Sequence, residues 1–331
     1  MATTGVLVTG GAGYIGSHVA RQLNEQHERV IILDNLSTGF KAAALGNELV
    51  VGDTGDITLV RHLLKEYAIE AVLHFAAHTI VPESVENPLK YYSNNTCHSR
   101  NLLQCCAEAG VKHFIFSSTA AVYGNPATAL VSETAPTAPI NPYGTSKLMT
   151  EWMLRDVSAA SDLRYVALRY FNVAGSDPQG RIGQATKLAT LLIKVACEAA
   201  VGKRSAISIF GTDYPTADGT GVRDYIHVED LAAAHLSALN YLRQGGQSET
   251  LNCGYGHGYS VREVLQMVER VNGKPLNIIE QPRRAGDPAA LVADARRIGE
   301  VLGWRPHYDD LEIIVASALN WERKLLSNPY A

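Results

Sequence analysis

A glycine-rich turn between an apolar strand and a helix constrains this chain more than any other feature. Residues 5–9 (GVLVT) are short and apolar, which is typical of a buried β-strand. Residues 10–16 (GGAGYIG) follow and satisfy the G-x-G-x-x-G pattern. The glycines permit a tight turn and a close approach of backbone to pyrophosphate, and the helix expected over 14–26 points its positive end at that anion. The segment therefore predicts a dinucleotide site.

A carboxylate follows the next strand. Residues 29–33 (RVIIL) indicate a second buried strand, and Asp34 and Asn35 come directly after it. Asp34 lies 18 residues beyond Gly16, close to the position from which a carboxylate hydrogen-bonds the ribose 2′-hydroxyl. The same carboxylate would repel a 2′-phosphate, and no arginine adjoins it. The sequence therefore favours NAD over NADP as cofactor.

A tyrosine and a lysine four residues apart form a candidate acid/base pair. Tyr143 and Lys147 share one face if residues 143–160 are helical, as expected. A tyrosine phenol has an unperturbed pKa of about 10, too high for a base at neutral pH. A neighbouring ammonium favours the phenolate and lowers that pKa. The pair therefore suits proton transfer at an alcohol or a ketone.

Strands and helices alternate through the first half of the chain. Further strands are expected at 49–51, 71–75, 112–116 and 164–169, with helices at 57–67, 88–109 and 143–160 between them. This alternation predicts an α/β fold, a doubly wound parallel sheet with helices on both faces. Ligands of such sheets bind beyond the carboxyl ends of the strands. Asp53, Thr119 and residues 170–172 all fall at such ends, so we expect them to converge on one cleft.

The rhythm changes after Asn172. Turn-rich segments and short strands follow, including strands expected at 206–210 and 250–253. We expect a Rossmann domain of residues 1–172 plus about 226–253. A smaller α/β lobe that binds the substrate would comprise about 173–225 plus 254–331. Arg223 and the Arg283-Arg284 pair are candidate phosphate anchors in this lobe, because guanidinium groups suit phosphate oxygens.

Composition limits the remaining possibilities. The chain has 331 residues, 46% of them hydrophobic, which is enough for a large core. A net charge of -4 argues against nucleic acid as a partner, and no apolar run reaches membrane-spanning length. The first strand begins too early to leave room for a signal peptide. Five cysteines without metal-ligand spacing predict reduced thiols, a cytoplasmic location and no metal site.

Several motifs together resemble the extended short-chain dehydrogenase/reductase superfamily and, within it, the UDP-glucose 4-epimerases. The matching segments span nearly the whole chain: LVTGGAGYIGSH at 7–18, DNL at 34–36, HFA at 74–76, FSSTAAVYG at 116–124, PYG at 142–144, RYFN at 169–172, FGTDY at 210–214, DGTGVRDYIHV at 218–228 and RRAGD at 283–287. The segment 218–228 is long enough to be highly specific.

The resemblance implies a UDP-hexose enzyme of galactose metabolism with tightly held NAD. Tyr143 would remove the proton of the sugar's 4-hydroxyl while C4 gives a hydride to NAD. Lys147 would bind the nicotinamide ribose and lower the pKa of the phenol, and Thr119 would bridge the sugar oxygen and Tyr143. The 4-keto sugar would then turn over and take the hydride back on its other face. UDP-glucose and UDP-galactose would thus interconvert.

The resemblance also implies binding residues and a homodimer. The implied cofactor-binding residues are Gly10, Gly13, Tyr14, Ile15, Gly16, Asp34, Asn35, Asp53, Thr54, Phe75, Ala76, Ala77, Asn95, Ser117, Tyr143, Lys147 and Tyr170. The implied substrate-binding residues are Thr119, Tyr143, Asn172, Phe210, Arg223, Arg283, Asp287 and Leu291. Asp53 would contact adenine and Tyr170 would lie near nicotinamide. The dimer would form through helices 88–109 and 143–160.

Three positions depart from the family pattern. Thr79 stands where many relatives carry lysine, which alters contacts near the nicotinamide. Leu191 stands where relatives use asparagine or histidine near the diphosphate. Leu291 occupies the position that limits sugar size in relatives, where a tyrosine excludes N-acetylated sugars and a small residue admits them. An intermediate leucine predicts glucose and galactose as main sugars, with weak activity on N-acetylhexosamines.

Three other functions remain open at this point. One is a 4-epimerase of another UDP-sugar, with a pentose, a uronic acid or an N-acetylhexosamine. The second is a nucleotide-sugar dehydratase, whose relatives carry an Asp-Glu pair after the threonine. Here Ala120 and Ala121 follow Thr119, so elimination lacks its general acid. The third is an NAD-sensing binding protein, which would need the glycine turn but not Thr119, Tyr143 and Lys147.

Overall fold

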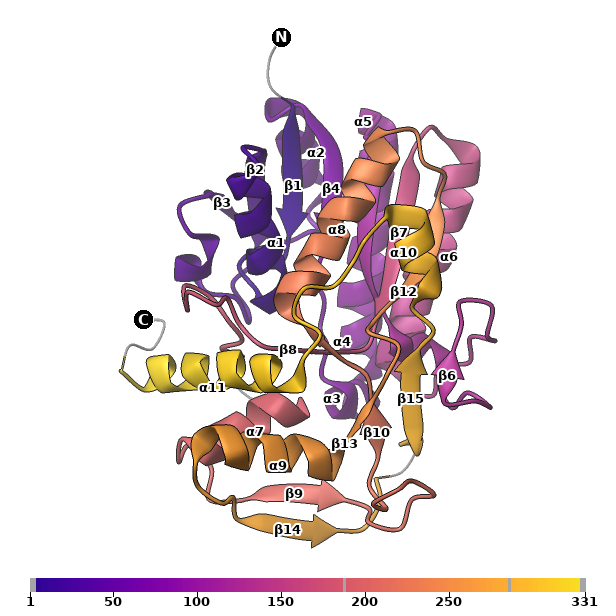
Figure 1. The fold of residues 1–331 in the computed structure, drawn as a ribbon. Coiled ribbons are helices and arrows are strands. Elements are labelled where there is room, and N and C mark those ends of the chain that lie inside the picture. Colours follow the sequence, from indigo (N-terminus) through magenta and orange to yellow (C-terminus); the bar gives the residue numbers. More distant parts are fainter. Residues whose placement is uncertain (1–3, 187–188, 285–286, 328–331) are drawn as a thin grey trace.

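A seven-stranded parallel sheet forms the larger part of the molecule. The computed structural model describes residues 4–186, 189–284 and 287–327. The strand order is β12-β7-β5-β4-β1-β2-β3, and every neighbouring pair is parallel (Figure 1). The strands are β1 (Gly5–Thr9), β2 (Arg29–Asp34), β3 (Glu48–Val51), β4 (Ile69–His74), β5 (His113–Thr119), β7 (Arg164–Tyr170) and β12 (Glu249–Cys253). The predicted doubly wound parallel sheet is confirmed.

Helices cover both faces of this sheet. α1 (Tyr14–Glu25) and α8 (Val228–Arg243) pack on one face, while α2 (Ile57–Glu66), α5 (His98–Ala109) and α6 (Pro142–Ala160) pack on the other. Successive residues of β1 point to opposite sides, so Val6 and Val8 join the first core cluster and Leu7 joins the second. The strand order reverses between β1 and β4, and ligands of open α/β sheets bind at such a point.

The helix expected over 88–109 is interrupted. The structure has α4 (Pro88–Tyr91), a π-helical turn over Tyr92–Cys97 and then α5. A short helix α3 (Val81–Glu86) precedes them. π-Helical turns are rare and often occur at functional sites, because the extra residue redirects side chains. Here the turn contains the buried Asn95.

Short strands and three helices build the opposite end of the molecule. The strands form a four-stranded sheet of β13 (Tyr259–Ser260), β10 (Val222–Arg223), β15 (Ala290–Ala293) and β6 (Leu130–Val131), and the pairs β11 (Tyr225–His227) with β8 (Asn172–Ala174) and β14 (Ile278–Gln281) with β9 (Ile207–Phe210). The helices at this end are α7 (Leu192–Ala200), α9 (Val261–Asn272) and α11 (Leu311–Ser327). Elsewhere, α10 (Arg296–Leu302) lies beside β12, and two 3₁₀ turns, Lys41–Ala44 and Ala120–Tyr123, contact α1 and α6 respectively. α7, α9 and α11 share one apolar core through Ile193, Val264 and Ile314.

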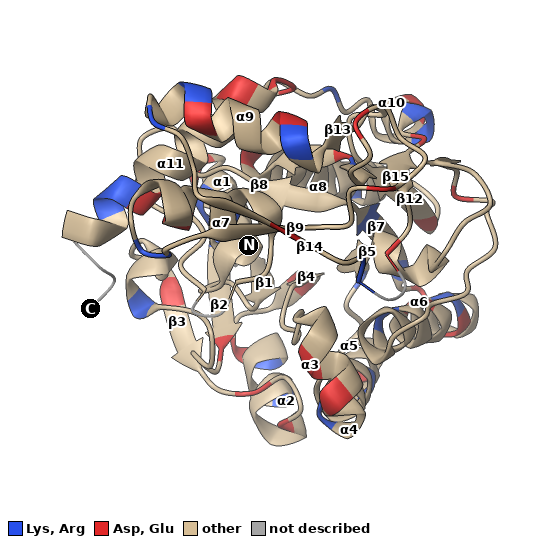
Figure 2. Ribbon diagram, turned by 90° about the horizontal axis from the view of Figure 1, so that it is seen from below, with Lys and Arg blue, Asp and Glu red and all other residues tan. Residues whose placement is uncertain are grey.

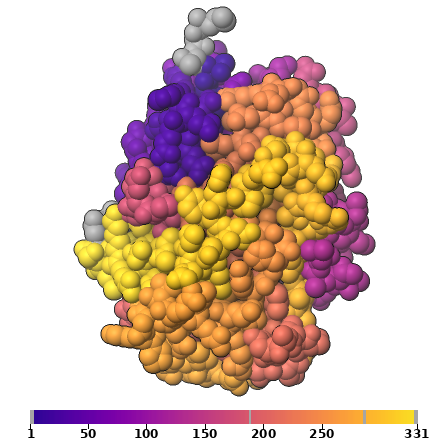
Figure 3. All heavy atoms as spheres, viewed as in Figure 1, coloured from indigo at the N-terminus to yellow at the C-terminus, as the bar shows by residue number. Residues whose placement is uncertain are grey.

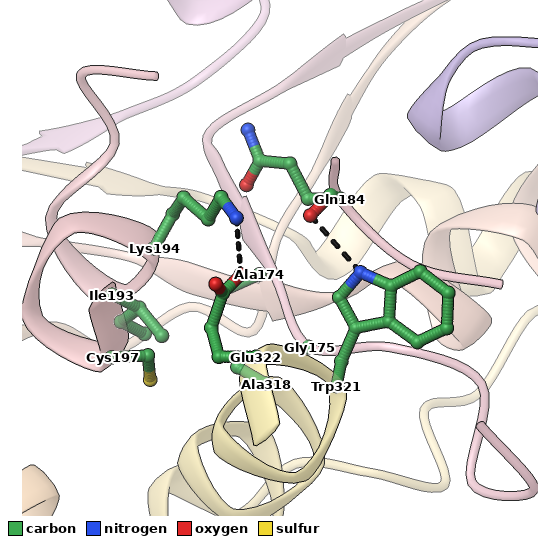
Figure 4. Close-up of a pocket in the computed structure, with 9 residues that line it drawn as sticks. All are labelled: Ala174, Gly175, Gln184, Ile193, Lys194, Cys197, Ala318, Trp321 and Glu322. Carbon is green, nitrogen blue, oxygen red and sulfur yellow. Dashed lines mark hydrogen bonds and ion pairs between the residues drawn. The ribbon is translucent and has the colours of Figure 1, made fainter. Parts of the chain in front are cut away.

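Helix α11 secures the chain that leads into α7. The indole N–H of Trp321 donates to the carbonyl of Gln184 over 3.0 Å, and the Lys194 ammonium bonds to the Glu322 carboxylate beside a small cavity (Figure 4). Lys203 reaches the second oxygen of Glu322 at 2.9 Å. In the space-filling view α11 lies between the N-terminal elements and α9 (Figure 3). The C-terminal helix therefore holds Gln184 on one side and α7 on the other.

Lysine, arginine, aspartate and glutamate residues are dispersed over the outer helices (Figure 2). Among the described residues, no helix combines the length and the apolarity that crossing a membrane requires.

Candidate active site

Helix α6 brings Tyr143 and Lys147 to the carboxyl end of β5. The Asn141 side chain caps the helix by accepting from the backbone N–H of Gly144 at 2.8 Å, and Pro142 occupies the first turn. This start places Tyr143 and Lys147 one turn apart on the buried face, with only 8% and 3% of their surface exposed. The Lys147 ammonium donates to the carbonyl of Ser117 at 2.8 Å. The predicted acid/base pair therefore lies inside the molecule, against β5.

Burial dominates the electrostatics of the pair. It raises the pKa of Tyr143, against a hydrogen bond with the Thr119 hydroxyl that lowers it. It also lowers the pKa of Lys147 to about 7, while the negative charge of Glu151 works to raise it. The sequence predicts a lowered pKa for the Tyr143 phenol, but in the protein without NAD this pKa is raised. The reason is that both groups are removed from water, which disfavours the charged form of each.

Two further side chains tie neighbouring elements to this pair. The Thr119 hydroxyl, at the end of β5, accepts from the backbone N–H of Ala121 at 3.1 Å. The Asn95 amide donates to the carbonyl of His78 at 2.9 Å and to the hydroxyl of Ser146 at 3.1 Å. Asn95 thereby joins the loop after β4 to α6. Asn95 is positioned by the π-helical turn, and no sequence pattern predicts that turn.

The glycine turn has the shape that a pyrophosphate needs. Gly10 has φ of +70°, and a Cβ there would come within 2.6 Å of the Ala76 backbone nitrogen. A Cβ on Gly13 would meet only the Gly10 carbonyl, at 3.2 Å, among the described atoms within 4 Å. Gly13 caps α1 without a side-chain bond, and the described first turn, which includes Tyr14, Ile15 and Gly16, carries no acidic residue. The N–H groups of this turn therefore remain available to an anion.

Carboxylates lie at the ends of β2 and β3. Asp34 accepts from the backbone N–H of Ala12 at 3.0 Å and of Leu36 at 2.8 Å. Burial raises the pKa of Asp34, against the lowering effect of these two bonds. The Asn35 amide donates to Asp53 at 3.0 Å, and the buried Thr54 follows. The structure thus brings together the predicted ribose-binding and adenine-binding groups.

Aromatic side chains line the region between these groups and α6. The hydroxyls of Tyr170 and Ser117 are hydrogen-bonded. The rings of Phe75 and Tyr170 lie 4.8 and 6.3 Å from the ring of His235 on α8. Ala76 and Ala77 follow Phe75 and are half-buried. The predicted nicotinamide-side residues therefore occupy the carboxyl ends of β4, β5 and β7.

Four of the predicted substrate residues lie on the smaller strands: Asn172, Phe210, Arg223 and Leu291. Arg223 on β10 and Leu291 on β15 are register partners. Leu291 packs with Phe171 against the cluster that contains Ala120 and Tyr123, so it adjoins the segment after Thr119. Asn172 opens β8, and its backbone N–H donates to the carbonyl of Asp224 at 3.0 Å. These contacts bring the substrate lobe to the end of β5.

The arginine pair separates into two roles. The Arg283 guanidinium donates to Asp213 at 2.7 Å and lies 4.3 Å from the centre of the Tyr214 ring. The Arg284 guanidinium lies 3.7 Å from the centre of the Phe210 ring at the end of β9. Asp287 follows Ala285 and Gly286, which lie outside the described residues. Arg283, the predicted phosphate ligand, is therefore held by an acidic neighbour, whereas Arg284 stands over an aromatic ring.

Two positions that depart from the family pattern are open to solvent. Leu191 caps α7 and is 37% exposed, and Thr79 is exposed in the loop after β4. Sequence reasoning missed a buried pair behind the site, in which Glu151 accepts from Arg169 at 2.6 Å. The spacing of Lys147 and Glu151, four residues apart on α6, was a signal that could have placed Glu151 on the same face as Lys147, but it does not point to Arg169.

Comparison with known proteins gives a consistent set of relatives. The model of the NAD dependent epimerase/dehydratase family matches residues 6–254. A UDP-glucose 4-epimerase of Azospirillum brasilense is 56% identical over 97% of this chain and 92% of the relative. The structure of UDP-glucose 4-epimerase from Brucella ovis in complex with NAD is 43% identical, with a TM-score of 0.94 over 96% of this chain and 98% of that one. The enzyme from Bifidobacterium longum, in complex with NAD+ and UDP, is 39% identical with a TM-score of 0.92 over 99% of both chains.

Proposed function

This chain belongs to the NAD dependent epimerase/dehydratase family, and we propose that it interconverts UDP-glucose and UDP-galactose by inverting C4 of the sugar. The observation that carries this function is the placement of Thr119, Tyr143 and Lys147 together at the end of β5, beside the glycine turn at Gly10. Full-length similarity to UDP-glucose 4-epimerases supports the same reaction.

NAD is the cofactor, and the described residues fit it. The uncapped first turn of α1 and the open space at Gly13 suit the pyrophosphate. Asp34 would hold the adenine-side ribose, and Asn35 with Asp53 would border the adenine. Phe75, Tyr170 and Lys147 would surround the nicotinamide and its ribose. Bound NAD supplies the hydride acceptor and donor that the reaction needs.

Tyr143 carries the proton in this proposal. Its phenolate oxygen takes the proton of the sugar's 4-hydroxyl and later returns it, with the Thr119 hydroxyl bridging the two oxygens. Because burial raises the pKa of this phenol, the phenolate needs a positive charge nearby, and Lys147 is the closest lysine on the same helix face. The 4-keto sugar must turn between the two hydride transfers, so the protein must grip the nucleotide and leave the sugar loosely held.

The nucleotide would be held by the smaller lobe. We assign Asn172, Arg223 and Asp287 to the UDP portion, as the family resemblance implies. We assign Arg283 to the nucleotide as well, next to its exposed partner Asp213, and Arg284 over the Phe210 ring is a second candidate guanidinium. Residues 1–172 plus about 226–253 would form the NAD domain, which agrees with β12 lying at the edge of the large sheet.

The setting of the enzyme follows from the same proposal. We assign it to galactose metabolism in the cytoplasm, which is consistent with five cysteines that are all free thiols. A homodimer would form through α4, α5 and α6, where Leu89 and Trp152 are exposed.

Turnover of UDP-galactose by the purified protein, with no NAD added, tests the function. We expect UDP-glucose as the product, separated by chromatography, because the cofactor stays bound. A 4-keto-6-deoxy product would instead indicate a dehydratase, although Ala120 and Ala121 provide no acid for that reaction. No conversion of UDP-hexoses, even with NAD supplied, would refute the proposal and direct the search to UDP-pentoses and UDP-uronic acids.

A further inference from the structure

Three successive residues of β5 contact three successive turns of one face of α6. Thr119 bonds to Tyr143, the carbonyl of Ser117 accepts from Lys147, and the Ser118 hydroxyl donates to Glu151 at 2.5 Å. Tyr143, Lys147 and Glu151 are spaced by four residues, so they form one stripe along the helix. Glu151 therefore lies one helical turn beyond Lys147, on the same face of α6 as the acid/base pair.

A row of polar side chains across the sheet holds Glu151. Ser118, Arg169 and Asn252 are register partners on β5, β7 and β12. Arg169 grips the Glu151 carboxylate through Nε at 3.0 Å and through a second nitrogen at 2.6 Å. The Tyr123 hydroxyl accepts from Arg169 at 3.0 Å and donates to Asn252 at 2.7 Å. Glu151 is only 5% exposed, so its position is fixed by this row.

The charges around Lys147 single out Glu151. On β4 the ring of His74 is buried, and its pKa is lowered to about 3, so it is neutral at physiological pH. On β5 Lys147 meets the Ser117 carbonyl and the face of Phe116, 5.0 Å from the ring centre. Burial lowers the pKa of Lys147 to about 7, and Glu151 is the charged group that raises it.

The remaining neighbours of Lys147 are neutral or already paired. Burial raises the pKa of Tyr143 on the same helix and of Tyr170 on β7, so both phenols are neutral in the protein alone. Arg169 on β7 is committed to Glu151, and Tyr123 stacks 4.9 Å from the Arg169 guanidinium. Among the described residues around Lys147, the Glu151 carboxylate is thus the anion that favours its ammonium form.

We propose that Glu151 is a positioning residue that favours the ammonium form of Lys147 beside Tyr143. The catalytic role of Lys147 in this inference rests on the proposed function. The titration of Lys147 itself can be measured without turnover. A buried lysine without a compensating carboxylate loses its proton at lower pH, because burial disfavours the charged form. Without Glu151, Lys147 would therefore be increasingly neutral at physiological pH.

The test follows the Lys147 side chain directly. NAD-loaded protein labelled with ¹³Cε-lysine is titrated by NMR, and the Lys147 signal is assigned by its loss in Lys147→Met. In Glu151→Gln we expect the midpoint to fall by about one pH unit. The alkaline limb of kcat for UDP-galactose should move in the same direction. Glu151→Asp keeps the charge and should restore both the Lys147 midpoint and the alkaline limb. Glu312→Gln, on the exposed face of α11, is the control: it also removes one carboxylate but should leave the Lys147 midpoint unchanged.

A second variant is needed because Glu151→Gln could destabilise the fold. Glu151→Gln leaves Arg169 buried without its partner, so Glu151→Gln/Arg169→Met is prepared in parallel as a neutral pair. An unchanged Lys147 midpoint in folded Glu151→Gln would overturn the proposal. If Glu151→Gln does not fold, the double variant is compared with Arg169→Met, which keeps Glu151, and equal Lys147 midpoints in these two would overturn the proposal. A shifted midpoint in a protein that does not epimerise UDP-galactose would refute the proposed function and leave this inference standing.

Discussion

At the scale of single residues, the Tyr143 phenol is the group on which the chemistry depends. Tyr143→Phe removes one oxygen from a buried site and leaves the glycine turn and Asp34 unchanged. We expect NAD to remain bound and kcat to fall by about 10²–10⁴-fold, the usual contribution of a positioned acid/base. NAD content by absorbance and turnover of UDP-galactose measure the two effects. Full activity in the NAD-loaded variant would eliminate Tyr143 as the base.

The sugar range depends on Leu291. This side chain packs beside Phe171 and the segment after Thr119, where the sugar must turn. We expect the protein to turn over UDP-glucose faster than UDP-N-acetylglucosamine. Leu291→Ser should raise the relative rate on the N-acetylated sugar by about tenfold, because a few carbons in a pocket change discrimination by that order. Leu291→Tyr should lower it. Comparable turnover of both sugars by the unchanged protein would contradict this ranking.

At the scale of elements, the Glu322 carboxylate joins α7 to α11 through Lys194 and Lys203. Glu322 is 1% exposed, so Glu322→Gln removes a buried carboxylate from Lys203 and leaves Lys194 with Glu198 as its remaining partner. We expect the free energy of unfolding to fall by about 3 kcal/mol, as is typical for breaking a buried pair. The midpoint of urea unfolding measures this loss. Glu312→Gln, also on α11, breaks an exposed pair with Arg270 of α9 and should change it by less than about 1 kcal/mol. Equal effects of both substitutions would show that burial does not matter here.

Elements with strong local patterns could be predicted, and elements set by packing could not. The expected strand at 5–9 matches β1, because a short apolar run and a glycine turn bound it. The helix expected over 88–109 misses the π-helical turn, which is held by bonds from Asn95 to His78 and Ser146. Those partners are distant in sequence, so periodicity carries no trace of them.

The same distinction applies to the candidate site. Tyr143, Lys147 and the glycine turn follow from spacing alone. The pairing of Arg283 with Asp213 was not readable from the sequence, because Asp213 lies 70 residues away in the chain. The Glu151–Arg169 pair was overlooked because Glu151 lies on the helix α6 and Arg169 lies on the strand β7, 18 residues further along the chain.

At the scale of the whole molecule, exposed apolar side chains mark the proposed dimer surface. Leu89 on α4 is 76% exposed and Trp152 on α6 is 47% exposed, and these two helices pack together. We expect light scattering to give a mass twice the 35.8 kDa of one chain. Trp152→Glu should shift the protein toward the monomer, since a charge at an interface core is unfavourable. A monomeric mass for the unchanged protein at micromolar concentration would refute the dimer.

The fate of the hydrogen on C4 tests the central claim most directly. UDP-galactose carrying deuterium at C4 is converted in ordinary water, and the product is examined by NMR. Because the hydride leaves C4 and returns to the same carbon within one closed site, we expect UDP-glucose that retains the deuterium at C4. UDP-glucose with hydrogen at C4, its deuterium lost to water, would contradict epimerisation through a transient 4-keto sugar.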